Sequence, residues 1–432
     1  MHWVLIILKK IGFPTWTATL ARRIRRAVAH LRIFGLSSLL RVIIGELLRR
    51  IKVRALVQHD ILEHYRFLID ETSSPHSADP KRPITEVTDN TSNTLCWVVP
   101  SFDLGSGGHL NIFRMIYNLE SIGYTNHIVI FGPHNFTDAA KVRTIIREHF
   151  FPLQATVGLG TAAITPCEFL VATSWDTAYP VNTFTDCQHK LYFVQDFEPY
   201  FFALSSQYCF AETTYRYGFT GITAGNWLAD KLSHDYGMRT FAFGFSYDKD
   251  LYIQHPRKPG SRRVFFYARH VTPRRGFELG ILALFYLHQR LPDVEFVLAG
   301  WDASTYKLPF PYLNAGTVEV KKLPALYSQC DVALVVSLTN LSLLPLELMA
   351  SGCPVVSNRG PNVEWLLQHD ANAWLADPTP QALGQALMTV LETPGLRQRL
   401  VQQGLDFAQS TDWHQEAQRV AAVLYDLKHQ RL

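Results

Sequence analysis

Short runs rich in β-branched and aromatic residues alternate with helix-length segments along most of this 432-residue chain. Four runs form a first series: TLCWVVP (94–100), HIVIF (127–131), EFLVATS (168–174) and KLYFVQD (190–196). Four more form a second series: RVFFYAR (263–269), VEFVLAG (294–300), DVALVVS (331–337) and CPVVSN (353–358). Strands that alternate with helices in this way belong to parallel sheets with crossover helices. The sequence therefore predicts an α/β protein with two βα domains.

A basic segment that contains two prolines, YIQHPRKPGSRR, separates the two series. We expect a hinge there. It would join an N-terminal domain of residues 94–255 to a C-terminal domain of residues 256–400, and a helix would follow over 401–432. Ligands of such folds bind beyond the carboxyl ends of the strands, so we expect the functional site in a cleft between the domains.

The first 54 residues carry an excess of positive charge. They hold 12 Lys and Arg and one acid, Glu46, whereas the rest of the chain holds 29 Lys and Arg and 36 Asp and Glu. The segments ARRIRRAVAHLRIF and LLRVIIGELLRRIKV place apolar residues at helical spacing and fill the remaining surface with cations. We expect a basic, amphipathic helical arm over residues 1–70, joined to the body by a polar linker of residues 71–93.

An arm of this kind suits an anionic membrane surface. Its apolar run from Trp3 to Leu8 is too short to span a bilayer, and no convincing signal-peptide cleavage site follows it. The alternative is that the arm packs on the body with its arginines in solvent. Nothing else in the chain supports binding to nucleic acid.

The cysteines and histidines do not predict a metal site. The six cysteines are scattered, without a CxxC pair or zinc-finger spacing, and the 17 histidines show no HExxH motif. We interpret the cysteines as reduced core thiols of a cytoplasmic protein. No metal cofactor is expected, so any bound anion would be neutralised by Arg, Lys and helix dipoles.

Residues 342–360, SLLPLELMASGCPVVSNRG, contain one carboxylate, Glu347, in an otherwise apolar run. One interpretation is a short helix that begins near the proline and whose acid complements the helix dipole. The alternative is that the loop and helix start at Ser342, Leu343 and Leu344 present N–H groups to an anion. Glu347 would then accept a hydrogen bond from the sugar of a nucleotide.

Cations gather at two other strand-to-helix turns of the second series. FYARHVTPRRG places Arg269, Arg274 and Arg275 around one turn, and VEVKKLP places Lys322 at another. Arginine binds phosphate through a planar, bidentate fork. One such cation is usually solvated surface, but several at one sheet edge favour an anion site.

The first series contributes a glycine loop, SFDLGSGGHLNIF, in which Gly107 and Gly108 follow a strand and precede a helix. This is not a GxGxxG motif, and its use would be close backbone approach to a phosphate or sugar. His109, directly after it, is a candidate acceptor-site residue.

Two carboxylates, Asp196 and Glu198, end a strand of the first series in FVQDFEP. Alternation in an extended chain places both on one side. They are candidates for orienting an acceptor or for acting as the general base at its hydroxyl. The alternative is that one of them satisfies buried backbone N–H groups.

The ordered set of motifs resembles the donor-binding signature of family 4 GT-B glycosyltransferases. The signature comprises Arg269, then Arg274 and Arg275 before a glycine, then PLELMASGCPVVSN. The segments SFDLGSGGHLNIF, YFVQDFEPYF and FYARHVTPRRGFELG are similar to the rhamnan-synthesis branch, whose members use dTDP-L-rhamnose. The resemblance covers about residues 94–400. It implies a GT-B fold, in which two Rossmann-like domains face a central cleft and bind the acceptor and the nucleotide sugar.

The chain departs from the family pattern at one acid. Members typically carry two glutamates separated by seven residues, and Thr339 stands where the first would precede Glu347. The resemblance implies that the missing acid contacts hydroxyls of the transferred hexose. Its loss points away from donors such as UDP-glucose or GDP-mannose and towards a deoxysugar.

The resemblance implies a retaining glycosyltransferase that moves L-rhamnose from dTDP-L-rhamnose to a cell-surface polysaccharide of O-antigen or rhamnan type. Arg269, Arg274 or Arg275, and Lys322 would stabilise the departing diphosphate. The protein would be cytoplasmic and peripheral on the inner face of the membrane. The alternatives are another nucleotide-sugar donor, or a catalytically silent GT-B domain in a polysaccharide assembly complex.

Overall fold

The computed structural model describes residues 61–69, 92–132, 136–257, 260 and 262–431. The predicted arm and linker lie almost wholly outside these ranges. The described part of the arm contains a short helix, α3 (Ile61–Tyr65), and the 3-10 turn η1 (Arg66–Leu68). Both sheets belong to one unit of the chain, formed by residues 67–132 and 143–432.

The first sheet consists of parallel strands in the order β3-β2-β1-β4-β5-β6-β7. Their bounds are β1 Thr94–Pro100, β2 Thr125–Phe131, β3 Thr156–Leu159, β4 Cys167–Ala172, β5 Cys187–Val194, β6 Thr220–Ala224 and β7 Thr240–Phe243. The connecting helices are α4 Gly107–Ile122, α5 Ala139–His149, α6 Trp175–Thr183, α7 Ser206–Thr214 and α8 Asn226–Tyr236.

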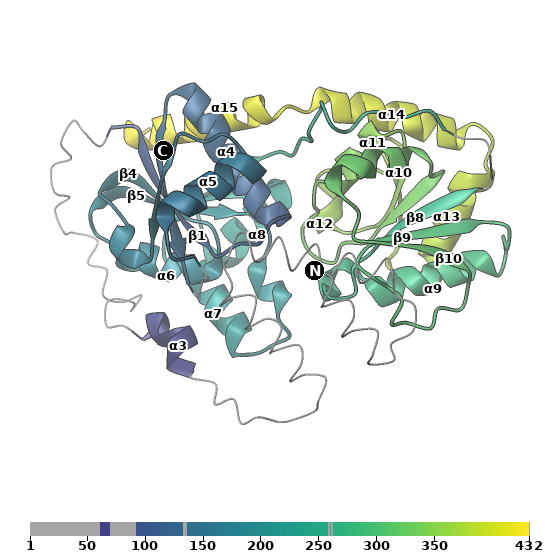
Figure 1. Ribbon diagram of the computed structural model, residues 1–432, viewed down its shortest axis with the longest axis horizontal. Helices are drawn as coiled ribbons and strands as arrows, with labels where there is room; N and C mark the ends of the chain where they lie inside the picture. The colour runs from purple at the N-terminus through teal and green to yellow at the C-terminus, as the bar shows by residue number, and fades with distance from the viewer. Residues whose placement is uncertain (1–60, 70–91, 133–135, 258–259, 261, 432) are drawn as a thin grey trace, which may run out of the picture. The chain divides into compact units, whose positions relative to one another are not determined.

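The second sheet is also parallel, in the order β10-β9-β8-β11-β12-β13. Its strands are β8 Arg263–Ala268, β9 Glu295–Gly300, β10 Tyr312–Gly316, β11 Val332–Val335, β12 Val355–Asn358 and β13 Trp374–Ala376. Its helices are α9 Phe277–His288, α10 Leu323–Ser328, α11 Leu344–Ala350, α12 Pro361–Glu364 and α13 Pro380–Glu392. Figure 1 labels most of these elements.

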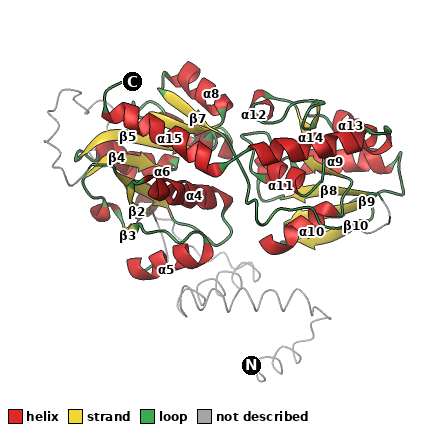
Figure 2. Ribbon diagram, turned by 90° about the horizontal axis from the view of Figure 1, so that it is seen from above, coloured by secondary structure: helices red, strands yellow, loops and turns green. Residues whose placement is uncertain are grey.

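Each sheet has the strand order of a Rossmann-like domain. The first three strands extend the sheet in one direction, and the fourth strand is added on the other side of the first. The changes of direction lie between β1 and β4 and between β8 and β11. Helices lie on both sides of the strands (Figure 2). Strands that are covered on both faces have nearly continuous apolar sequences. Strand β1 is an example, since Leu95 to Val99 are all buried.

The core of the second domain forms between its sheet and two of its helices. Val264, Phe266, Leu298 and Leu334 of the strands are buried together with residues of α9 and α13. Gly280 of α9 is required by this packing, because a Cβ there would lie 2.1 Å from the Phe266 ring.

The C-terminal segment forms two helices, α14 (Leu396–Ser410) and α15 (Trp413–Lys428), and not the one continuous helix that we expected. The break has a local cause, because the Asp412 side chain accepts a hydrogen bond from the Gln415 N–H at 2.9 Å and so starts a new helix. Helix α15 contacts the first domain, where Glu416 accepts from the Gly244 N–H at 2.6 Å. The chain therefore passes between the domains twice.

Within the described ranges, no helix combines the length and the apolar character needed to cross a bilayer.

Candidate functional site

The loops after β1, β5, β8 and β11 lie at the carboxyl ends of the two sheets, where Rossmann-like domains bind their ligands. Most of the residues predicted for the site fall in these loops or in the first turn of the following helix. The contacts of each side chain show whether it is available to bind a ligand or is already bound within the protein.

The glycine loop after β1 leads into α4, which begins at Gly107. Its N-cap residue, Ser106, makes no side-chain bond to the helix N–H groups. The Ser106 hydroxyl is instead 2.7 Å from His109 Nδ1, while His109 Nε2 is 3.1 Å from the Pro100 carbonyl oxygen. Because a carbonyl only accepts, Nε2 carries the proton and Nδ1 accepts from the hydroxyl. Among the described residues, the backbone N–H groups of Gly107 and Gly108 have no hydrogen-bond acceptor.

His109 therefore braces the loop with both of its ring nitrogens. Burial lowers the pKa of His109, against the opposing effects of the Pro100 carbonyl and Asp103. A neutral ring in this position holds the loop on α4. Its predicted role towards an acceptor stays a prediction.

Three arginines follow β8, as predicted, but their contacts differ. Arg275 donates to the Ser337 hydroxyl at 2.6 Å and to the Asn340 carbonyl oxygen at 3.2 Å, so its guanidinium orders the loop after β11. Arg269 donates to the Tyr267 hydroxyl at 3.3 Å and lies 5.7 Å from the Trp301 ring centre. These contacts leave more of Arg269 than of Arg275 for an anion.

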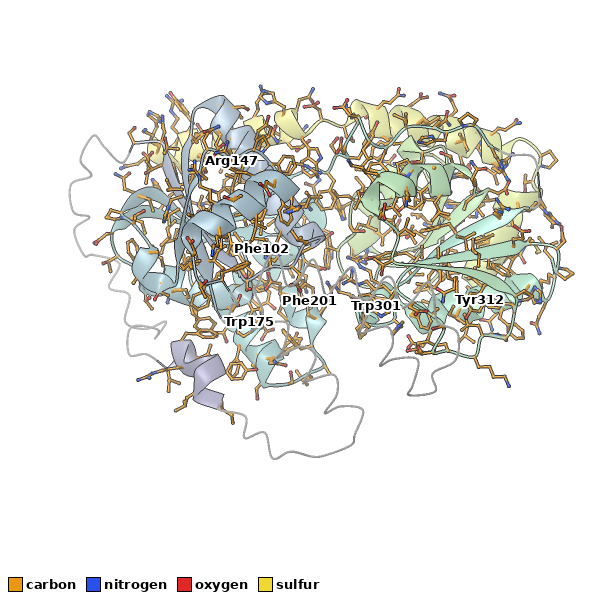
Figure 3. The ribbon with its side chains drawn as sticks, viewed as in Figure 1. Phe102, Arg147, Trp175, Phe201, Trp301 and Tyr312 are labelled. Atoms are coloured by element: carbon orange, nitrogen blue, oxygen red, sulfur yellow. The ribbon has the colours of Figure 1, made fainter. Side chains whose placement is uncertain are left out.

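Arg274 extends from the same turn towards the first domain. Its guanidinium lies 4.0 Å from the Phe201 ring centre, and its Nε is 3.6 Å from Asp196 Oδ2. Figure 3 labels Phe201 and Trp301, the aromatic residues beside Arg274 and Arg269. Among the described residues, the buried Nε atoms of Arg269 and Arg274 both lack a hydrogen-bond partner. A buried donor without an acceptor is costly in a protein interior.

Asp196 connects the two sheets. It follows β5, and its Oδ1 accepts from the Asn340 N–H at 2.9 Å while its Oδ2 accepts from the Thr339 hydroxyl at 2.8 Å. Burial raises the pKa of Asp196, and Arg275, Asn340 and Arg274 act in the opposite direction. The carboxylate thus joins the end of β5 to the loop after β11, and its role in catalysis stays a prediction.

The neighbouring amides extend this junction. Asn340 donates from its side chain to the carbonyl oxygens of Gln195 at 2.9 Å and Ala224 at 2.8 Å. Gln195 in turn donates to the Gly108 carbonyl oxygen at 3.0 Å, which ties the glycine loop to the same place. Neither Asn340 nor Gln195 was among the predicted site residues, because in a single sequence a loop amide carries no signal of its partner.

Glu198 lies on the first domain and contacts the start of α6. Its Oε2 accepts from the Trp175 N–H at 2.6 Å. Burial raises the pKa of Glu198 well above its ordinary value, against this hydrogen bond. This is the alternative that the sequence left open, a buried carboxyl that satisfies a backbone N–H, and its predicted part in catalysis stays untested.

Glu347 lies in the first turn of α11, and Ser342, Leu343 and Leu344 lead into that turn. Burial raises the pKa of Glu347 to about 7, while the Tyr252 hydroxyl and Arg114 act to lower it. Tyr252 belongs to the segment between the domains, and the buried Arg114 belongs to α4. Arg114 also stacks on Trp413, with 4.8 Å between guanidinium and ring centre.

Lys322 stands apart from these groups. It ends the 3-10 turn η7 (Val320–Lys322) after the edge strand β10, and β9 lies between that strand and β8. Its side chain is 69% exposed and forms an ion pair with Glu319 at 3.0 Å. A ligand that contacts both Lys322 and Arg269 would have to extend from the carboxyl end of β10, past that of β9, to that of β8.

The described residues contain no group of three or more His, Cys, Asp or Glu side chains arranged to hold a metal ion.

Two parts of the chain match families described from the protein WsaF. Residues 262–388 match the family "WsaF, C-terminal domain", and residues 157–226 match "WsaF, N-terminal domain". The matches fall on the second and first sheets respectively.

A curated protein, the O-antigen biosynthesis protein RfbC of Myxococcus xanthus, is 33% identical to this chain over 382 residues. The aligned region is 85% of this chain and 30% of RfbC. The chain therefore spans about a third of the length of the curated relative that it matches.

Solved structures share the fold. Sucrose-phosphate synthase from Thermosynechococcus elongatus has a TM-score of 0.59 and 15% identity, over 78% of this chain and 99% of that chain. Anabaena Alr3699/HepE in complex with UDP has a TM-score of 0.60 and 17% identity, over 77% of this chain and 100% of that chain. The two parallel sheets and the likeness to these structures confirm the predicted fold class. The protein has the two-domain, Rossmann-like GT-B fold.

Proposed function

We propose that this protein is a glycosyltransferase of cell-surface polysaccharide synthesis, and that it moves L-rhamnose from dTDP-L-rhamnose to a saccharide acceptor with retention of configuration. The GT-B fold, the WsaF matches and the likeness to RfbC support transfer of a sugar in O-antigen synthesis. The rhamnosyl donor rests on the sequence resemblance and on Thr339 at the position of the absent acid.

One observation carries the donor site. Arg269 and Arg274 flank one turn after β8, and each has a buried Nε donor without a hydrogen-bond partner among the described residues. A diphosphate supplies acceptor oxygens, which are the hydrogen-bond partners that these two Nε donors lack, and its negative charge would add to that of Asp196 beside Arg274. We therefore assign the diphosphate to Arg269 and Arg274, and assign to Arg275 the task of holding the loop that carries Asn340.

The other donor contacts follow from this placement. The backbone at Ser342, Leu343 and Leu344 would contact the diphosphate, as would the amides at Gly107 and Gly108 across the junction. Glu347 would accept a hydrogen bond from the 3′-hydroxyl of the deoxyribose. Lys322 would reach the diphosphate or base only after leaving its ion pair with Glu319.

In the reaction, the bond between the rhamnose anomeric carbon and the diphosphate oxygen breaks, and a bond to the acceptor oxygen forms. Positive charge develops on the sugar ring, and negative charge on the departing diphosphate is stabilised by Arg269 and Arg274. The departing phosphate oxygen takes the proton of the acceptor hydroxyl. This route needs no carboxylate nucleophile, and Asp196, Glu198 and His109 would shape the acceptor side of the site.

A transfer assay tests the proposal. Purified protein is given dTDP-L-rhamnose and L-rhamnose oligosaccharides, and release of dTDP is measured together with the elongated product. Arg269→Ala and Arg274→Ala should each lower kcat/KM by roughly a hundredfold, the scale on which a transition-state donor acts. Arg290→Ala, which removes an exposed arginine stacked on Tyr286, is the matched control. Wild-type protein without turnover on this donor refutes the rhamnosyl assignment, and turnover with UDP-glucose in its place establishes the alternative donor.

A further inference from the structure

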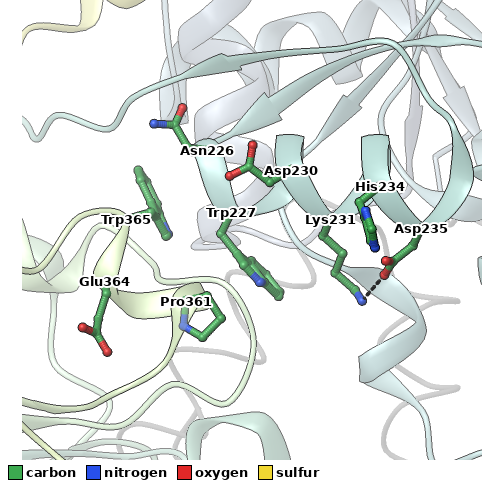
Figure 4. A pocket seen from close by; sticks show the side chains of 9 residues that line it. All are labelled: Asn226, Trp227, Asp230, Lys231, His234, Asp235, Pro361, Glu364 and Trp365. Atoms are coloured by element: carbon green, nitrogen blue, oxygen red, sulfur yellow. Dashed lines mark hydrogen bonds and ion pairs between the residues drawn. The ribbon is translucent and has the colours of Figure 1, made fainter.

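An open hollow of about 540 Å³ lies between α8 of the first domain and the α12 segment of the second. Trp227, Asp230 and His234 line it from α8, and Pro361, Glu364 and Trp365 line it from the other side. Its volume falls within the range of small-ligand sites, which combine aromatic walls with a few polar groups. Figure 4 shows the rings of Trp227, Trp365 and Pro361 next to one another in this hollow.

Trp365 is held in place before any ligand binds. Its Nε1 donates to the Asn340 side-chain oxygen at 2.8 Å, and its ring meets Phe245 edge-on with 5.3 Å between centres. Gly225 makes room for it, since a Cβ at that position would lie 2.5 Å from the indole. A rigid aromatic wall loses little conformational entropy on binding.

The charges of the hollow do not favour a diphosphate. Lys231 is engaged by Asp235 at 2.8 Å, and Glu364 lies 3.6 Å from Arg359. Asp230 lines the hollow at an exposed position and has no ion pair in the part of the chain that the structure describes. A free carboxylate beside indole rings repels phosphate but accepts hydrogen bonds from hydroxyl groups. The chemistry fits a neutral, polyhydroxylated ligand with apolar faces.

The hollow borders the junction where we place the reaction. Asn340 binds Trp365 through its side-chain oxygen and Asp196 through its N–H. On the other wall, the Lys231 ammonium lies 4.5 Å from the ring centre of Phe197, the residue after Asp196. The walls of the hollow are therefore in direct contact with residues of the junction.

We propose that the hollow binds the saccharide units of a neutral acceptor chain behind the unit that receives the new sugar. The proposal rests on the proposed function and adds to it the class of acceptor and the surface that selects its length. Trp227 and Trp365 would stack on the apolar faces of the sugar rings, and Asp230 would accept from their hydroxyls. A 6-deoxyhexose suits this wall, because its methyl group adds apolar surface.

The test uses the full chain and L-rhamnose oligosaccharides of one to six units, in two measurements. Binding is followed by tryptophan fluorescence, and transfer by the KM of each oligosaccharide at saturating dTDP-L-rhamnose. In the wild type, affinity should rise with length until the hollow is filled. Trp227→Ala should raise KM for the longer oligosaccharides about 3- to 10-fold, the contribution of one aromatic contact. It should leave KM for the monosaccharide and for the donor unchanged.

Asp230→Asn, at an exposed position, is a second variant that should fold whatever Trp227→Ala does, and it should weaken the same oligosaccharides. Tyr425→Ala removes an exposed aromatic residue of α15 and is the matched control. Affinity that is independent of length, or equal in the wild type and both variants, overturns the inference and leaves the proposed transfer standing. Oligosaccharide binding that depends on Trp227 in a protein without rhamnosyl transfer supports the hollow and overturns the proposed function. Displacement of the oligosaccharide by dTDP alone from this hollow contradicts the inference.

Discussion

At the scale of single residues, Glu347 has the most informative protonation state. Burial raises its pKa to about 7, from an ordinary value near 4.5. The folded state therefore holds its proton more tightly than the unfolded state. This group lowers the free energy of unfolding as pH rises from about 4.5 to 7. Glu347 therefore changes its charge near neutral pH, where the effect of that charge on binding can be measured.

The first prediction concerns donor affinity. If the ionised Glu347 accepts from the deoxyribose hydroxyl, affinity for dTDP-L-rhamnose should increase between pH 6 and pH 8, and Glu347→Gln should flatten that increase. The sugar nucleotide is the correct probe because its diphosphate has no ionisation near neutral pH, unlike dTDP. Isothermal titration across this range measures the affinity. Glu148→Gln, on the exposed side of α5, is the control, and an equal slope in the wild type and Glu347→Gln speaks against the contact.

The arginines show how far sequence reasoning reaches at this scale. Their grouping after β8 was predictable, because a strand followed by a polar turn fixes their position in the fold. The division of labour among them was not, since it depends on Asp196 and Asn340, which follow strands of two different sheets. A single sequence gives no information on contacts between separate sheets.

At the scale of elements, the turn that carries Arg274 and Arg275 depends on Gly276. This residue has φ +57°, and a Cβ there would lie 2.5 Å from Val336 of the neighbouring loop. Both the backbone conformation and the close approach therefore require glycine. The turn can keep its two arginines in place only if the residue after them has no side chain.

Replacing this glycine gives the second prediction. Gly276→Ala should lower the free energy of unfolding by more than the roughly 1–2 kcal/mol of left-handed strain alone, and it should reduce rhamnosyl transfer. Gly395→Ala is matched to it, since Gly395 has φ +76° but a Cβ at that position would meet nothing within 4 Å. Urea unfolding compares the two variants. Equal losses of stability in both would show that contact with Val336 is unimportant.

Five of the described strands lie outside the predicted runs: β3, β6, β7, β10 and β13. Four of them, β3, β7, β10 and β13, are the edge strands of the two sheets and have no continuous buried run. The segment TGITA of β6 is buried throughout but contains small residues. Apolar periodicity identifies strands that are covered on both faces by large side chains, and these segments lack that signal.

At the scale of the whole molecule, two crossings connect the domains: the segment around Tyr252 and the return of α15. Arg114 of α4 contacts Trp413 at the start of α15, and it lies near enough to influence Glu347. Arg114 of the first domain and Tyr252 of one crossing thus act on the charge of Glu347, and Trp413 of the other crossing packs on Arg114.

For the basic arm, the sequence is the only source of information. Its predicted residues 1–60 lie outside the described ranges. We propose that it holds the enzyme on the inner face of the membrane, where its cations meet anionic lipid. Removal of residues 1–70 should move the protein from the membrane fraction to the supernatant. Equal membrane retention of the truncated and full chains would assign the arm another task.

The central claim is that Arg269 and Arg274 hold the diphosphate of a thymidine sugar nucleotide, and nucleotide-dependent thermal stability tests it most directly. We predict that dTDP and dTDP-L-rhamnose raise the Tm of the wild-type protein and of Arg290→Ala by several degrees, more than UDP or GDP at the same concentration. The Arg269→Ala, Arg274→Ala double variant should lose this shift. An undiminished shift in the double variant, or no shift with any nucleotide in the wild type, would contradict the account.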